Sequence, residues 1–222
     1  MSILGNNLLA QYYAQQEALP SEYRRVEYLE STGTQYIDTG FIPQDSYVFG
    51  FDIKYLTKSL IGTSNFGCVF GGRKSSGGKE FQLSTYSINV NNGGILRIGG
   101  NGAANGFSAY MTSNVIQTAK YFNKTYTRPD GQQIINSSLA LVYGQYSLFV
   151  FTLNNSGTST QSGLGCRIYY LKLYNTVIER NLIPCIRKSD DKPGLYDLCR
   201  SICPLTGNSF YINAGTGEFV TP

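Results

Sequence analysis

Paired carboxylates are the residues from which hydrolysis of a glycosidic bond would start. Retaining glycosidases hold two carboxyl groups about 5 Å apart, and inverting enzymes hold them somewhat farther apart. No strand-like segment of this chain carries two acidic residues at i, i+2 or i, i+4. Glu27 and Glu30 precede the strand-rich region and are expected to be solvated. The carboxylates therefore do not predict a hydrolase.

The 222-residue chain contains no histidine, which removes the commonest general base. Ser–His–Asp and Cys–His nucleophilic sites and imidazole metal ligands are excluded with it. Tryptophan is also absent, so a platform that stacks against a sugar ring has to be built from tyrosine or phenylalanine. Together these features predict a protein that is not an enzyme.

The cysteines are odd in number and lack CxxC spacing, which favours free thiols made in a reducing compartment. One alternative is a zinc site, which needs four ligands and would combine Cys185, Cys199 and Cys203 with Cys68 or Cys166. Another alternative is a local disulfide formed on oxidation. Buried thiols or such a disulfide are favoured over the zinc site.

The charge balance is mildly basic, with 18 Lys and Arg against 14 Asp and Glu, and the excess is scattered along the chain. No aromatic-interleaved basic stripe is present, so no nucleic-acid partner is predicted. Two basic clusters could meet a phosphate or an acidic glycan but are expected to be solvated loop charges: Arg73, Lys74 and Lys79, and Arg187, Lys188 and Lys192. No cofactor is predicted, although calcium at a loop rim built from Asp130, Asp190 and Asp191 stays open.

A shallow carbohydrate site needs an aromatic face for the apolar side of the sugar and amide or charged groups for its hydroxyls. Two predicted loops offer that combination, and the candidate glycan-binding residues are Tyr86, Asn89, Asn91, Asn92, Tyr143 and Tyr146. The alternative is that these tyrosines are half-buried strand residues.

Short alternating runs separated by glycine-rich turns dominate the sequence after about residue 34. Only 14% of residues are charged, and 25 are glycine and 18 tyrosine, a mixture typical of many strands joined by tight turns. Strands are expected at 35–39, 47–55, 67–72, 80–86, 94–99, 119–126, 132–135, 139–143, 147–153, 166–174 and 209–213. The pattern predicts an all-β, two-sheet antiparallel sandwich.

The first 19 residues differ from the rest of the chain. Leucines and tyrosines recur there at roughly helical spacing, which predicts a short amphipathic arm whose apolar stripe needs a surface to cover it: Leu4, Leu8, Leu9, Tyr12 and Tyr13. That surface is either the chain's own globule or another chain. The segment has neither the basic leader nor the apolar core of a signal peptide, and no membrane-spanning run is found, so membrane insertion is not expected.

Two regions of the chain resemble laminin-G-like, concanavalin-A-like jelly-roll modules, which are abundant in tailed bacteriophages and prophages of gut bacteria. The opening resemblance lies in residues 19–30 (LPSEYRRVEYLE) and 31–40 (STGTQYIDTG). The closing resemblance lies in residues 165–174 (GCRIYYLKLY), 180–190 (RNLIPCIRKSD), 193–197 (PGLYD) and 210–219 (FYINAGTGEF). Residues 198–208 form a longer connection than such modules lead one to expect, and they are predicted to form a contact loop.

The resemblance implies a jelly-roll sandwich over residues 20–222. It does not cover residues 1–19, whose apolar stripe predicts an arm that anchors the protein to its own copies or to a virion component. It further implies a virion surface protein, made in the bacterial host cytoplasm, whose sandwich binds cell-surface or mucus glycans. Its other partners would be virion proteins and its own copies. The alternative is a purely structural capsid or tail decoration protein without glycan binding. In either case Gly33 in the STGT turn is expected to adopt a positive φ.

Overall fold

The computed structural model describes residues 18–44, 48–58, 67–74, 80–85, 95–99, 106–108, 110–135, 144–160 and 165–222. These residues form strands, turns and loops and no helix. Accordingly, no helix capable of crossing a membrane is found within the described ranges. The predicted helical arm, with its apolar stripe from Leu4 to Tyr13, lies outside the described residues.

The larger sheet contains ten strands in the order β11-β10-β9-β4-β15-β16-β17-β18, with β1 beside β16 and β2 beside β15. At its centre, β4 pairs with β15 along nearly its whole length. The bounds of its strands are β1 Tyr23–Arg25, β2 Leu29–Ser31, β4 Phe49–Thr57, β9 Gln117–Phe122, β10 Thr125–Thr127, β11 Gln133–Ile135, β15 Cys166–Asn175, β16 Val177–Arg187, β17 Lys192–Asp197 and β18 Phe210–Tyr211.

The smaller sheet contains eight strands, with β14-β13-β5-β6-β7-β8 in order and β12 joining β3 to β5. Its strands are β3 Ile37–Asp38, β5 Gly67–Arg73, β6 Glu80–Thr85, β7 Ile95–Gly99, β8 Gly106–Ser108, β12 Phe149–Val150, β13 Leu153–Asn155 and β14 Thr158–Thr160. The expectation of a wholly antiparallel sandwich is wrong at one place, because β13 runs parallel to β5.

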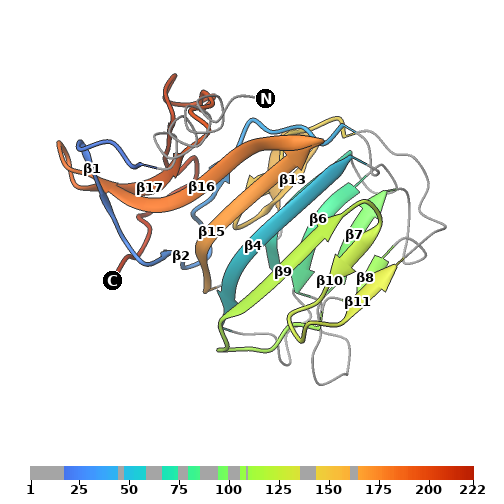
Figure 1. The fold of residues 1–222 in the computed structure, drawn as a ribbon. Helices are drawn as coiled ribbons and strands as arrows, with labels where there is room; N and C mark the ends of the chain where they lie inside the picture. The colour runs from blue at the N-terminus through green and yellow to red at the C-terminus, as the bar shows by residue number, and fades with distance from the viewer. Residues whose placement is uncertain are drawn as a thin grey trace, which may run out of the picture.

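Aromatic side chains join the two sheets face to face. Phe51 of β4 packs edge-on against Phe70 of β5 with ring centroids 5.0 Å apart, and Phe49 makes the same contact with Phe81 of β6. The main core extends across both inner faces. Figure 1 shows β15, β4 and β9 in one layer with β6 and β7 in the layer behind them. The all-β, two-sheet prediction is confirmed, and the arrangement is consistent with a β-sandwich.

A second, smaller cluster lies on the outer face of the ten-stranded sheet. Residues of β16 alternate between faces, so Leu182 enters the main core whereas Ile183 and Cys185 enter the second cluster. Its other members are Tyr196, Leu198 and Phe210, with Leu19, Tyr23, Tyr170 and Ile212 packed against them. The end of the predicted arm therefore meets the sheet at Leu19.

Two expected strands are interrupted by residues with positive φ. The segment expected at 119–126 is a hairpin, in which Asn123 (φ 47°) and Lys124 (φ 63°) form the turn between β9 and β10. The segment expected at 147–153 breaks at the buried Phe151, whose φ is 69°. A bulky side chain rarely adopts this conformation, so the alternation of apolar residues did not reveal the break. The positive φ expected of Gly33 is confirmed at 132°.

Candidate functional site

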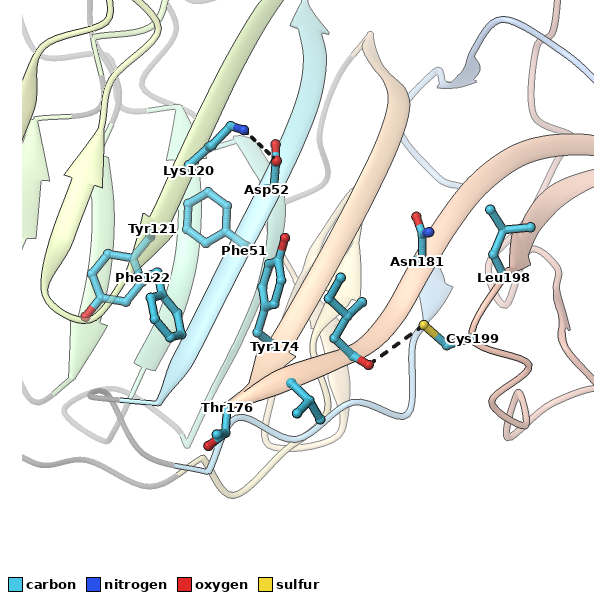
Figure 2. Close-up of a pocket in the computed structure, with 12 residues that line it drawn as sticks. Phe51, Asp52, Lys120, Tyr121, Phe122, Tyr174, Thr176, Asn181, Leu198 and Cys199 are labelled. Atoms are coloured by element: carbon cyan, nitrogen blue, oxygen red, sulfur yellow. Dashed lines mark hydrogen bonds and ion pairs between the residues drawn. The ribbon is translucent and has the colours of Figure 1, made fainter. Parts of the chain in front are cut away.

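A cleft of about 760 Å³ opens on the outer face of the ten-stranded sheet. Figure 2 shows side chains from β4, β9, β15 and β16 converging on it, with the segment after β17 closing one side. The residues that line it are Phe51, Asp52, Lys120, Tyr121, Phe122, Tyr174, Thr176, Val177, Ile178, Asn181, Leu198 and Cys199.

Strand register sets one polar row across this face. Asp52 of β4 is opposite Lys120 of β9 on one side and Lys172 of β15 on the other, and Lys172 is in turn opposite Asn181 of β16. Inward neighbours such as Phe51, Tyr121 and Leu171 belong to the main core, so the alternation of strands turns the polar row outward. Four adjacent strands thus present amine, carboxylate, amine and amide groups in sequence.

Asp52 is the anchor of this row. Lys120 Nζ lies 2.9 Å from its Oδ2, and the Tyr170 hydroxyl donates a 2.9 Å hydrogen bond to its Oδ1. Burial raises the pKa of Tyr170 to about 12, and the bond to the Asp52 carboxylate adds to the rise, so Tyr170 stays a proton donor at neutral pH. Each oxygen of Asp52 therefore has one partner, and these two contacts hold the carboxylate in position.

An aromatic row runs beside the polar one. Phe122, Gly50, Tyr174 and Ile178 are register neighbours across β9, β4, β15 and β16. The Phe122 and Tyr174 rings have centroids 6.4 Å apart and are tilted by 59°. Figure 2 shows both rings at the cleft, with the Tyr174 hydroxyl directed toward Asp52. Phe122 is 50% exposed, and together with the exposed Val177 and Ile178 it forms a patch of apolar side chains at the cleft.

The buried Asp197 at the end of β17 fixes the opposite wall. Its Oδ1 accepts hydrogen bonds from the backbone amides of Asn181 (2.7 Å) and Cys199 (3.0 Å). Its Oδ2 lies 4.0 Å from Arg180 Nε. The side-chain amide of Asn181 has no hydrogen-bond partner among the described residues and lines the cleft. Burial raises the pKa of the neighbouring Cys199 thiol to about 11.

The arrangement is suited to binding a ring with one apolar face. Tyr174 and Phe122 offer aromatic surface, and Lys120, Asp52 and Asn181 offer donors and acceptors alongside it. Among the described lining residues Asp52 is the one carboxylate, and it already has two partners. A glycosidase would need a second carboxyl group facing the first.

Most of the sequence-predicted glycan residues, namely Tyr86, Asn89, Asn91, Asn92 and Tyr143, lie outside the described residues. Tyr146 is half-buried, and its backbone oxygen approaches Gly72 of β5, so it belongs to the smaller sheet and away from the cleft. The predicted contact loop at 198–208 contributes Leu198 and Cys199 to the cleft wall.

The cysteines considered for a zinc site do not lie together. Cys203 belongs to the main core, Cys185 to the second cluster, and Cys199 to the cleft wall. No metal-binding group of three or more ligands occurs among the described residues, and all five thiols are free. At the residues considered for calcium, Asp130 pairs with Arg128 and Asp190 with Arg187.

One expectation about the acidic residues is wrong. Glu27 is exposed, but Glu30 is only 4% exposed and pairs with Lys58 and Arg167. Glu30 lies on β2, which pairs with β15, so the sheet itself covers this carboxylate. Sequence position before the strand-rich region gave no sign of that pairing.

The basic clusters make local contacts where they are described. Arg187 is bound by Asp190 at 2.6 Å, the Lys188 ammonium donates to the Ser21 carbonyl, and Arg73 donates to the Asn155 side chain. Lys79 lies outside the described residues. These contacts favour structural roles for Arg73, Arg187 and Lys188.

Comparison with protein-family models finds none that matches this chain, and comparison with curated proteins finds no similar sequence.

Proposed function

We propose that this chain is a non-enzymatic carbohydrate-binding protein and that the cleft on the ten-stranded sheet is its binding site. The observation that carries the proposal is the aromatic row of Phe122 and Tyr174 beside the polar row of Lys120, Asp52 and Asn181. A pyranose stacks its C–H face on an aromatic ring and presents hydroxyls at its edge. The predicted loop site at Tyr86 to Tyr146 remains a second candidate surface.

We further propose that the protein sits on the surface of a tailed-phage particle after synthesis in the bacterial host cytoplasm. Support comes from the resemblance of residues 19–40 and 165–219 to jelly-roll modules of such phages, and from the two-sheet fold. We infer jelly-roll connectivity between the sheets on the same basis. Several copies on one particle would compensate for a weak single site.

A glycan array tests the binding proposal. The wild-type chain is expected to bind a reproducible class of cell-surface or mucus glycans. Tyr174→Ala and Phe122→Ala should each weaken that binding about tenfold, as expected when one aromatic contact worth about 1.4 kcal/mol is lost. Tyr110→Ala is the matched control, since Tyr110 is 40% exposed and stacks on Arg128 outside the cleft. Binding that survives both cleft substitutions would place the glycan elsewhere.

The second candidate function is a structural decoration or cementing protein that binds no glycan. Exposed apolar side chains at the cleft rim favour it, because Val177 is 65% and Ile178 45% exposed. Tight binding to particles that lack the protein, together with no binding to any glycan on the array, would support a structural role over carbohydrate binding.

Attachment to the particle is proposed to run through the arm, whose stripe is Leu4, Leu8, Leu9, Tyr12 and Tyr13. A chain beginning at Ala18 keeps the packing of Leu19 on the second cluster. It is expected to fold with nearly unchanged thermal stability, to be monomeric and to fail to join particles. Normal assembly of this shortened chain, or its unfolding, would contradict the anchoring role.

A further inference from the structure

We propose that the cleft selects glycans carrying a carboxylate, and that Lys172 is the residue that recognises it. This inference rests on the proposed carbohydrate-binding function. It concerns the charge of the ligand, which the aromatic row does not determine.

The argument begins with the partners of the charged groups around the cleft. Lys120 is paired with Asp52 at 2.9 Å, and Asp52 also accepts the hydrogen bond of Tyr170. On the far wall, Asp197 faces Arg180 at 4.0 Å. Asp52, which lines the cleft, and Asp197, which is buried behind its wall, therefore each have a cation nearby.

Lys172 is left without a carboxylate partner among the described residues. It lies in the polar row between Asp52 and Asn181, on the face opposite the core residues Leu171 and Leu173. Its positive charge acts on the Cys199 thiol, which lines the cleft. Lys172 is a half-buried residue that borders the cleft without being one of its lining residues, and its register partners Asp52 and Asn181 both line it.

An unpaired ammonium beside an aromatic platform distinguishes an acidic sugar from a neutral one. The aromatic row accepts the ring in either case, while only a carboxylate gains a charge-assisted hydrogen bond. The free amide of Asn181 is adjacent in register and can serve the same substituent or a neighbouring hydroxyl. One unpaired lysine at the border of an aromatic site fits a single anionic substituent better than a polyanionic backbone, which needs many phosphate contacts.

The test compares each acidic saccharide with its neutral counterpart. Suitable pairs are sialyllactose with lactose, and oligogalacturonides with their carboxyl-reduced forms, measured by isothermal titration calorimetry at low and moderate salt. The acidic members are expected to bind about tenfold more tightly at low salt, with a preference that shrinks as salt rises. Lys172→Gln should bring the affinity for the acidic member down to that for the neutral one, and Lys172→Arg should preserve the preference.

Lys54→Gln is the matched control. Lys54 lies on the outer face of β4, with its ammonium group 5.2 Å from the centroid of the Tyr169 ring. Its register partners, Tyr170 and Thr118, do not line the cleft, whereas those of Lys172 do. The Lys54→Gln substitution removes the same charge and should leave the preference for acidic saccharides intact. Equal loss in Lys54→Gln and Lys172→Gln would overturn the assignment to Lys172.

The remaining outcomes separate this inference from the proposed function. If neutral and acidic members bind equally and Tyr174→Ala abolishes both, the acidic preference is wrong while carbohydrate binding stands. If the wild-type chain binds neither member of any pair and nothing on the array, both proposals fall. Circular dichroism of each variant shows whether it has kept the β-sheet fold.

Discussion

Gly50 and Phe122 are opposite each other across β4 and β9, and the Phe122 ring occupies the space that a side chain at position 50 would need. A Cβ on Gly50 would lie 2.8 Å from Phe122 Cδ2 and 2.7 Å from the Tyr121 carbonyl oxygen. The glycine thus lets the ring lie over the sheet toward Tyr174. The aromatic row depends on this absent side chain.

Gly50→Ala is therefore expected to destabilise the fold and to displace the Phe122 ring. The backbone carbonyl of Tyr121 cannot move freely within a central strand pair, so an overpacking cost of about 1–3 kcal/mol is expected. Glycan affinity should fall as well, because the platform is disturbed. Urea unfolding and calorimetric titration measure the two effects.

Gly131→Ala separates the loss of stability from the loss of glycan affinity. Gly131 has φ +83° in an open turn with no atom within 4 Å of its would-be Cβ, so the substitution costs about 1–2 kcal/mol of backbone strain alone. It should lower stability and leave glycan binding unchanged. If Gly50→Ala behaved in the same way, Gly50 would not control the ring.

Ile168→Ala tests the centre of the main core. Ile168 is fully buried on β15, with β2 and β4 on either side, and the lost methyl groups leave a cavity in close-packed surroundings. A loss of about 2–5 kcal/mol of unfolding free energy is expected. Thermal denaturation measures it against Thr118→Ala, an exposed position on β9 that should change stability little. Equal stability in the two variants would contradict the observed burial.

The carboxylate of Glu30 makes stability depend on acid pH. Burial by itself raises the pKa of Glu30, but the hydrogen bonds and charges of Lys58 and Arg167 outweigh burial and lower it below 4.5. A lowered pKa in the folded state means that the ionised form stabilises the fold above pH 4.5 and that this contribution is lost as pH falls through the folded value.

Glu30→Gln should accordingly be less stable than wild type at pH 7, by about 1–3 kcal/mol, and the difference should shrink in acid below pH 4.5. Urea unfolding at several pH values gives both curves. Glu27→Gln, at an exposed neighbour, is the control and should follow the wild type. Parallel wild-type and Glu30→Gln curves down to pH 2 would show that this ion pair does not carry the dependence.

The cysteines should differ in their reactivity toward iodoacetamide in the native state. Burial raises the pKa of Cys68 and Cys185 to about 12 and makes both thiols poor nucleophiles, whereas Cys199 is half-exposed with a pKa of about 11. Cys199 is expected to be alkylated first, slowly at pH 8 and faster at pH 10. Mass spectrometry of tryptic peptides identifies the site.

A bound glycan should protect Cys199, because the thiol lines the cleft. Protection by a ligand that binds the wild type, and none in Tyr174→Ala, would tie the ligand to this face. Modification of Cys203 before Cys199 would contradict the burial of Cys203 in the main core.

The local features of the fold were predictable from sequence because they depend on neighbouring residues. The segment 166–174 was expected to be a strand, and the structure has β15 at Cys166–Asn175, with Leu171 and Leu173 in the main core. The turn glycine Gly33 was predictable for the same reason, since its φ follows from the turn it makes.

The cleft was decided by tertiary structure alone. Its polar row needs β4 beside β15 and β15 beside β16, and nearly half of the sequence lies between β4 and β15. Alternation along a strand shows which of its residues share a face. Only the order of the strands in the sheet shows which residues of different strands lie side by side. Glu30 is buried because its strand, β2, pairs with β15. Phe151 has a positive φ at the point where the chain reverses between β12, antiparallel to β5, and β13, parallel to it. In each case long-range packing overrode the local pattern, since the energy of a buried contact depends on partners that the neighbouring residues do not specify.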